Sequence, residues 1–183
     1  MSIKDLKKSK MWIGLQFGNS LIAKKIKKYS KIYYPTALNL ASHVLAIIYT
    51  NRKFYVYEST MEENKHEGLN RGCRHYTLKK FLRIEKKAIP EYILYPINFN
   101  FKILDENLGC SYAFSTIKDL MLSAILKKNN KNPDRIGKIC SEFLADAYKP
   151  IQEYYDLKAW QITPAHWQRY CEEQKLKSIK LTN

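Results

Sequence analysis

The chain has 183 residues, a length that suits one domain, and its 45% hydrophobic content can build one sizeable core. Aromatic residues make up 13% and include 14 tyrosines, which argues against a disordered chain. The 32 Lys and Arg residues outnumber 17 Asp and Glu, and the net charge of +15 attracts polyanions such as nucleic acid, anionic membrane lipid or teichoic-type polymers. The basic residues are spread along the chain, so solvated basic faces are the simpler interpretation.

Four cysteines, Cys73, Cys110, Cys140 and Cys171, lie far apart and form no Cys-x-x-Cys pair. This spacing argues against a structural zinc site, and a disulfide framework is not typical of a chain this long. We therefore expect free thiols in a reducing compartment, with no metal and no cofactor.

The N-terminal residues 1–10 are polar and basic, and the apolar stretch after them is interrupted at Gln16, Gly18 and Asn19. This pattern does not fit a signal peptide, and no run approaches the roughly 20 apolar residues of a membrane-spanning helix. The sequence therefore predicts a cytoplasmic protein, with residues 1–10 and 175–183 flexible. A role at the cell wall would need another route, such as delivery in a phage particle or lysis.

The first half of the chain predicts short strands and a basic helix. Residues 11–17 form the first expected strand, and Ser20 caps a helix over 21–29 with an apolar stripe and lysines elsewhere. A Pro35-containing loop leads to two strands, 43–50 and 54–59, around a tight Asn51-Arg52 turn. A polar loop over 61–68 precedes a further strand at 69–76.

The second half predicts mainly helices. Thr77 caps a short helix ending at Leu82, and a strand over 92–97 has Pro96 near its end. The spacing of apolar residues predicts an amphipathic helix over 115–128. A cysteine-containing helix follows over 138–148, ended by Pro150, and Thr163-Pro164 opens the last helix.

His43 stands at the mouth of a strand that is apolar on both faces, as expected of a central strand. A lone histidine at a strand end usually has a structural role. A catalytic role for His43 therefore depends on whether a suitable partner lies beside it. If the chain turns at Asn51-Arg52, the numbers of facing residues add to 103 and Glu58 lies diagonal to His43, within side-chain reach. A carboxylate there would orient the imidazole. A three-residue turn would shift the register to 104 and send Glu58 to the other face.

Cys140 falls in the first turn of its expected helix, where the helix dipole favours a thiolate and backbone N–H groups can form an oxyanion hole. Gly137, three residues earlier, allows a close approach of the chain. The alternative is a buried and inert cysteine. The other thiols offer no helix start near a histidine: Cys73 lies beside His75 on a strand, Cys110 precedes the 115–128 helix, and Cys171 is inside the last helix. His66 lies in a polar loop and His166 on the surface of the last helix.

Six short segments, taken in order, resemble the circularly permuted papain-like amidases. This family is the permuted branch of the NlpC-type cysteine peptidase superfamily, with bacterial YiiX-type and poxviral members. The resemblance covers residues 11 to about 170. The matching segments are Phe17-Gly18-Asn19-Ser20, Ser42-His43-Val44, Val56-Tyr57-Glu58, the Gly-x-x-Tyr-x-Phe segment at 109–114, Cys140-Ser141-Glu142-Phe143 and Thr163-Pro164-Ala165.

The resemblance implies an α+β fold, a small antiparallel sheet or barrel packed against helices that include the nucleophile helix. It implies that Cys140 is the nucleophile, His43 the general base, Glu58 a third member and Tyr112 an accessory group near the oxyanion. Two departures bear on the substrate groove. The first strand carries Ile13-Gly14-Leu15-Gln16 in place of the usual Gly-Asp opening, and segment 60–68 is longer and more charged.

The preferred hypothesis is a cysteine hydrolase, an amidase or peptidase acting through a thioester, with acyl transfer as a possible variant. Its substrates would be cell-wall peptides, lipid-linked amides or esters, or N-acyl amino acids, and its basic face could meet an anionic polymer or membrane. One alternative is a catalytically inactive papain-like binding module. Another is a basic protein that binds nucleic acid or other polyanions, in which Cys140 and His43 are core residues.

Overall fold

The computed structural model describes residues 6, 9–65, 68–85, 91–113 and 137–181. The strands of its main sheet are β1 (Met11–Gln16), β2 (His43–Thr50), β3 (Lys53–Thr60), β4 (Gly72–Thr77), β5 (Tyr92–Pro96) and β8 (Ile179–Leu181). The helices are α2 (Leu21–Ser30), α3 (Leu78–Glu85), α4 (Phe101–Glu106), α6 (Cys140–Asp146), α7 (Lys149–Tyr155) and α8 (Pro164–Glu173), with a 3₁₀ turn at Ala159–Gln161. Two further short strands, β6 (Ser111–Tyr112) and β7 (Gly137–Lys138), pair in parallel.

The main sheet has the strand order β4-β3-β2-β1-β5-β8, and its neighbouring strands all run antiparallel. This confirms the expected α+β class with an antiparallel sheet. The barrel alternative is wrong, because the described strands form an open sheet in which β4 and β8 are the edges.

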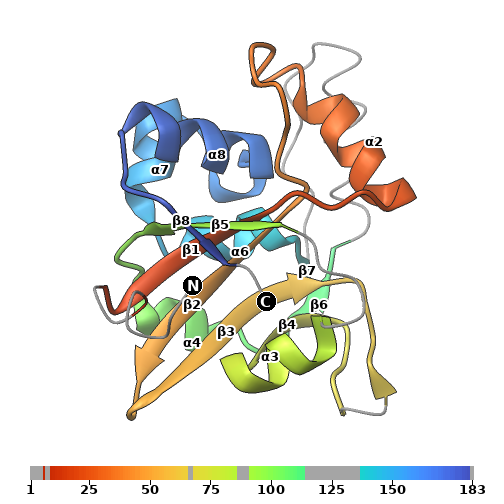
Figure 1. Cartoon of the computed structure of the whole chain (residues 1–183), viewed down its shortest axis with the longest axis vertical. Helices are drawn as coiled ribbons and strands as arrows, with labels where there is room; N and C mark the ends of the chain where they lie inside the picture. Colours follow the sequence, from red (N-terminus) through yellow and green to blue (C-terminus); the bar gives the residue numbers. More distant parts are fainter. Residues whose placement is uncertain (1–5, 7–8, 66–67, 86–90, 114–136, 182–183) are drawn as a thin grey trace.

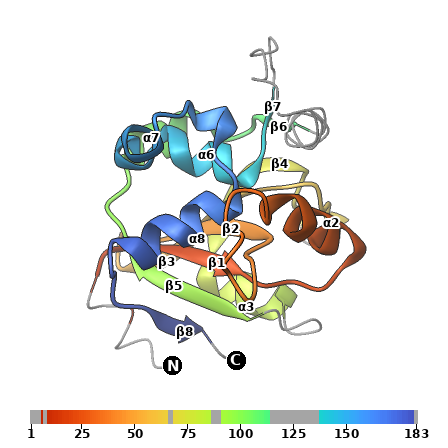
Figure 2. The same cartoon turned by 90° about the horizontal axis from the view of Figure 1, so that it is seen from above.

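Helices cover both faces of the sheet (Figures 1 and 2). Residues of α4, α6, α7 and α8 belong to one large buried cluster, whereas α3 packs into a second one. Strand β2 explains this division, because Val44, Ala46 and Ile48 enter the first cluster while Leu45 and Ile47 enter the second. β2 is therefore the central strand that its two apolar faces predicted.

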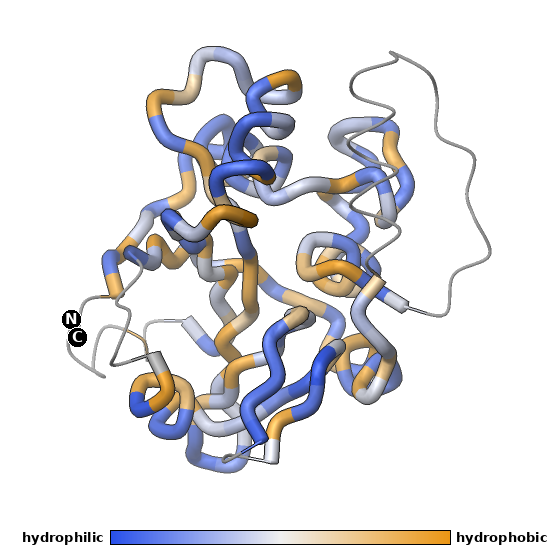
Figure 3. The backbone as a smooth tube through the Cα atoms, turned by 90° about the vertical axis from the view of Figure 1, so that its right-hand side faces the viewer, coloured by the Kyte–Doolittle hydropathy of each residue, from blue (hydrophilic) through white to orange (hydrophobic). Residues whose placement is uncertain are grey.

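Hydrophobic residues occur in short groups along the backbone, interleaved with hydrophilic ones (Figure 3). None of the helices in the described part of the chain has the length and apolar character that crossing a membrane requires. The apolar residues instead supply the two buried clusters on the faces of the sheet.

The β2–β3 hairpin has the predicted two-residue turn. Asn51 and Arg52 have φ values of +47° and +61°, the left-handed conformation that a two-residue hairpin turn of this hand requires. Thr50 faces Lys53 and Ala46 faces Tyr57, so the predicted register of 103 is confirmed. This register decides where Glu58 lies relative to His43.

Ser20 caps α2 as expected, because its Oγ accepts a hydrogen bond of 3.1 Å from the Ala23 N–H. The apolar stripe of this helix is only partly covered, with Leu21 80% and Ile22 44% exposed. α2 stands beside the sheet, next to α8, rather than on one of its faces (Figure 1).

Three predicted boundaries are wrong. α6 begins at Cys140 rather than 138, because residues 137–138 pair with β6 as strand β7. α6 ends at Asp146 rather than 148, and Pro150 lies in the first turn of α7, a helix that was not predicted, because proline there loses no intrahelical hydrogen bond. The expected strand over 69–76 begins only at Gly72.

The end of the chain also differs from expectation. We expected residues from 175 onward to be flexible, but Ile179–Leu181 form β8 and pair with β5. Leu181 is buried in the second cluster and Ile179 packs against it, so apolar burial fixes this segment. The expected 115–128 helix lies outside the described residues.

Candidate active site

Cys140 is the first residue of α6 and is buried, 4% exposed, at the junction of that helix with β7. The helix is held firmly in place: Phe143 and Leu144 are fully buried, and the Trp167 indole N–H donates to the Ser141 carbonyl at 3.2 Å. The sulfur itself receives backbone hydrogen bonds from Val44 and Ser141. The protein therefore fixes the thiol and supplies donors that favour its anionic form.

The imidazole of His43 interacts with this thiol. Burial alone raises the pKa of Cys140, but the charge and hydrogen bond of His43 and the two backbone donors lower it below its ordinary value. Burial alone lowers the pKa of His43, but the charge and hydrogen bond of Cys140, with those of Glu58, raise it to about 10. Both directions favour a thiolate–imidazolium pair.

Glu58 holds the other side of the imidazole. Its Oε2 lies 3.2 Å from His43 Nε2, so the predicted diagonal contact between β2 and β3 is present. The neutral histidine must carry its proton on Nε2 to donate to this carboxylate, which leaves the Nδ1 lone pair for the thiol proton. The carboxylate thus selects the tautomer that a base for Cys140 needs.

Two neighbours on β4 keep Glu58 ionised. Its Oε1 accepts from Arg74 Nε at 3.0 Å and Nη2 at 2.8 Å, and from the Tyr76 hydroxyl at 2.6 Å. Although burial alone raises the pKa of Glu58, His43, Arg74 and Tyr76 together lower it to about 2. The carboxylate is therefore charged at every pH at which the thiol could work.

Arg74 and Tyr76 did not enter the sequence-based site. Their spacing of two places them on the same face of β4, and β4 pairs so that Arg74 lies opposite Glu58. The alternation of side chains along this strand could have indicated from the sequence that Arg74 and Tyr76 share a face. The register between β3 and β4, however, depends on a connection over residues 61–71 that has no recognisable short turn.

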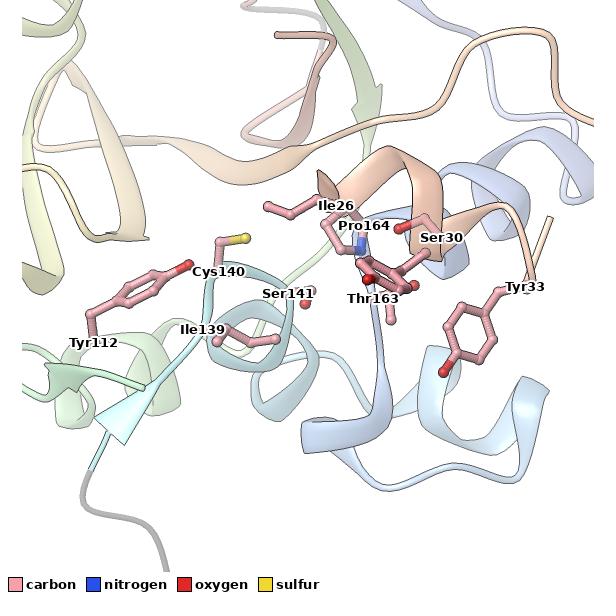
Figure 4. Close-up of a pocket in the computed structure, with 10 residues that line it drawn as sticks. Ile26, Ser30, Tyr33, Tyr112, Ile139, Cys140, Ser141, Thr163 and Pro164 are labelled. Carbon is pink, nitrogen blue, oxygen red and sulfur yellow. The ribbon is translucent and has the colours of Figure 1, made fainter. Parts of the chain in front are cut away.

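Tyr112 comes from β6 and its hydroxyl points toward Cys140 (Figure 4). Burial and then the neighbouring Cys140 raise the pKa of its phenol well above its ordinary value. The phenol therefore stays protonated and can donate a hydrogen bond to a negative oxygen formed beside the sulfur.

The remaining cysteines and histidines lie in other environments. Cys73 and Cys171 are buried, and burial raises the pKa of Cys73 to about 12 and that of Cys171 further still. His75 is exposed and stacks on Tyr57, with ring centroids 5.1 Å apart. The four cysteines are free thiols, and the described residues contain no cluster of three His, Cys, Asp or Glu that could hold a metal.

The prediction that His166 lies on the surface is wrong. It is 6% exposed, and its Nδ1 accepts a hydrogen bond of 3.0 Å from the Thr163 N–H, which completes the cap of α8. Burial lowers the pKa of His166 to about 4, so it is neutral. His66 and Phe114 lie outside the described residues.

The thiol opens into a groove of about 730 Å³. His43, Glu58 and Arg74 line it together with Tyr112 and Cys140. The other walls come from α2, from the ends of β1 and β3 with the segments after them, from the loop before β2 and from the start of β5. They include Gln16, Asn19, Ile22, Asn39, Thr60, Glu62, Glu91 and Tyr92. The volume suits a small-molecule or peptide ligand.

Gly137 allows the close approach of β7 to β6, as its position before the Cys140 helix predicted. A Cβ at this position would lie 2.7 Å from the Ser111 carbonyl oxygen and 3.0 Å from the Ala113 nitrogen.

We expect Gly137→Val to destabilise the protein by about 1–3 kcal/mol, because the crowded β6 backbone must shift. Chemical denaturation measures this. Gly18→Ala is the control, because Gly18 has no positive φ and a Cβ there would contact only the side chains of Ser42 and Ala23, at 3.3 and 3.5 Å. A fully stable Gly137→Val variant would contradict the close approach.

Neither a comparison with protein-family models nor one with curated proteins finds a match to this chain. The chemistry of the site therefore has to be inferred from its own geometry.

Proposed function

We propose that the protein is a cysteine hydrolase, an amidase or peptidase with a permuted papain-like fold, that cleaves an amide bond through a thioester on Cys140. The observation that carries the proposal is the chain of contacts from Cys140 to His43 and on to Glu58. A buried thiol that is merely structural needs neither a helix start nor an oriented imidazole.

The order of elements supports the permuted papain-like fold. The histidine strand β2 precedes the nucleophile helix α6 in the chain, yet the two elements pack together. The histidine-first order is the reverse of that in papain, and it is the order that the resemblance to the permuted family requires.

The reaction would begin with attack of the Cys140 thiolate on the carbonyl carbon of the amide. The negative oxygen that forms would accept hydrogen bonds from the first N–H groups of α6 and from Tyr112. The His43 imidazolium would give its proton to the nitrogen as the C–N bond breaks, releasing the amine and leaving an acyl thioester. His43 would then take a proton from water, which attacks the thioester and releases the acid and the thiol.

The charges of the groove bear on the competing hypotheses. Among the described residues that line it, Glu58, Glu62 and Glu91 are acidic, and Arg74 is paired with Glu58. The described lining thus holds three carboxylates against two basic side chains, His43 and Arg74, although Glu91 is paired with Lys180. A neutral or amine-bearing substrate suits this groove better than a polyanion does.

Acylation by p-nitrophenyl acetate at pH 6, followed by intact and peptide mass spectrometry, tests the proposal. We expect one acetyl group on Cys140, which is then lost by hydrolysis, and none on Cys140→Ser. Cys110→Ser is the matched control, because Cys110 is a partly exposed thiol that does not line the groove, and this variant should acylate like the wild type. Acetylation that is absent, or that falls mainly on Cys110, would contradict the proposal.

A further inference from the structure

A second, much smaller pocket adjoins the thiol, and its lining contains none of the groove's acidic residues. It has a volume of about 50 Å³ and lies between α2, the start of α6 and the Thr163-Pro164 corner. Figure 4 shows the side chains of Ile26 and Cys140 pointing toward one another at its edge. Its apolar walls come from Ile26, Tyr29, Tyr33, Tyr112, Ile139 and Pro164, and the described residues place no charged side chain in it.

The pocket and the groove meet at the sulfur. Cys140, Tyr112 and Ile26 line both of them, whereas His43 lines the groove alone. A substrate attacked at its carbonyl carbon therefore has one half directed to an apolar pocket and the other to a wide polar groove.

The position of His43 determines which half of the substrate lies in the groove and which lies in the pocket. The leaving nitrogen must receive its proton from the imidazole, so it has to lie within hydrogen-bond reach of His43. Since His43 lines the groove and not the pocket, the amine half occupies the groove. The acyl half, which stays on the sulfur as a thioester, is left with the apolar pocket.

We infer, on the basis of the proposed function, that the substrate is an amide whose acyl group is short, uncharged and aliphatic and whose amine half is the larger and more polar part. The size of the pocket sets the length of the acyl group. A cavity of about 150 Å³ holds benzene, so 50 Å³ takes roughly two or three carbon atoms beyond the carbonyl. A carboxylate on the acyl group would be desolvated there without a basic side chain to pair with, because the polar lining residues Ser30, Ser141 and Thr163 offer only hydroxyls.

A series of p-nitrophenyl esters tests this inference, because the leaving group stays constant while the acyl group changes. The readout is the rate of Cys140 acylation for acetate, butyrate, octanoate and the negatively charged succinate monoester. We expect the rate to rise roughly fourfold per methylene from acetate to butyrate. It should gain nothing further at octanoate and should fall at least tenfold from butyrate to succinate.

Two variants of α2 make the test specific. Tyr29 lines only the pocket and Ile22 only the groove. We expect Tyr29→Ala to enlarge the pocket and move the best ester toward octanoate, while Ile22→Ala keeps the wild-type order. If Tyr29→Ala does not fold, the wild-type series alone decides the inference.

The failures of the two proposals are distinguishable. Equal rates for all four esters, or a preference for succinate, would overturn the acyl-pocket inference. If iodoacetamide still labels Cys140 at pH 6 in that case, the hydrolase proposal stands. A Cys140 that is inert to the esters and to iodoacetamide alike would overturn the proposed function and the inference with it.

Discussion

Glu58→Gln is expected to lower the free energy of unfolding by about 3–5 kcal/mol, because it leaves the Arg74 guanidinium without its carboxylate partner in a largely buried site. The side chains of Glu58 and Arg74 are only 7% and 14% exposed, so water cannot replace the lost contact fully. Urea denaturation monitored by circular dichroism measures the change.

Glu62→Gln is the matched control. Glu62 lines the same groove and undergoes the same chemical change, but it is exposed, so its substitution should stay within about 0.5 kcal/mol of the wild type. If Glu62→Gln lowered the free energy of unfolding as much as Glu58→Gln, any Glu-to-Gln change in the groove would be destabilising. That result would contradict a specific effect of the pairing of Glu58 with Arg74.

The double variant Glu58→Gln/Arg74→Met distinguishes two roles of Glu58, its contribution to stability and its positioning of His43. Removing the unpaired charge should restore much of the stability. Cys140 should remain slow to acylate, because the imidazole still lacks the carboxylate that selects its tautomer. Recovery of the acylation rate along with stability would mean that Glu58 has only a structural role.

The free energy of unfolding of the wild-type protein should depend on pH through the same two groups, Glu58 and His43. The pKa of Glu58 is lowered from 4.5 to about 2, so its contribution to stability is present above pH 4.5 and lost as the pH falls through about 2. The pKa of His43 is raised from 6.5 to about 10, so its contribution is complete below pH 6.5 and lost as the pH rises through about 10.

His43→Ala is expected to reduce the rate of Cys140 acylation at pH 6 by about 10²- to 10⁴-fold, the usual contribution of a general base. Without the imidazole, burial, the largest influence on the pKa of the thiol, still raises it, and only the two backbone donors oppose it. The residual rate should therefore increase with pH beyond the ordinary thiol pKa of about 8.5. Stopped-flow acylation by p-nitrophenyl butyrate across pH 5–10 gives both the rate and the profile.

His75→Ala is the control for this variant. His75 is the exposed histidine of β4, stacked on Tyr57, and its loss should leave the rate and the pH profile unchanged. An unaltered rate in His43→Ala would contradict the role assigned to His43 even if Cys140 proved reactive.

Much of the site could be predicted because it depends on local signals. A two-residue turn at Asn51-Arg52 fixes the register of β2 and β3, and the register alone brings Glu58 to His43. The position of Cys140 at a helix start followed from the apolar residues after it and from Gly137 before it.

The parts that could not be predicted depend on distant contacts. Arg74 reaches Glu58 only through the register of β4 against β3, and residues 61–71 between these strands are too many for a two-residue turn to set it. β8 forms because Leu181 finds an apolar surface beside β5, and His166 is buried because Thr163 and the neighbouring aromatic rings enclose it. The apolar surface beside β5 and the ring of Tyr33 that contacts His166 both lie far away in the sequence, although Thr163 is close by.

The reactivity of the four cysteines toward iodoacetamide as a function of pH tests the central claim most directly. Peptide mass mapping of the folded protein compares Cys140 with Cys73 and Cys171, whose pKa values burial raises. The thiolate–imidazolium pair predicts fast labelling of Cys140, which lines the groove, already at pH 6, with Cys73 and Cys171 silent. Labelling of Cys140 only near its ordinary pKa of about 8.5, or no labelling while the protein is folded, would contradict an activated nucleophile.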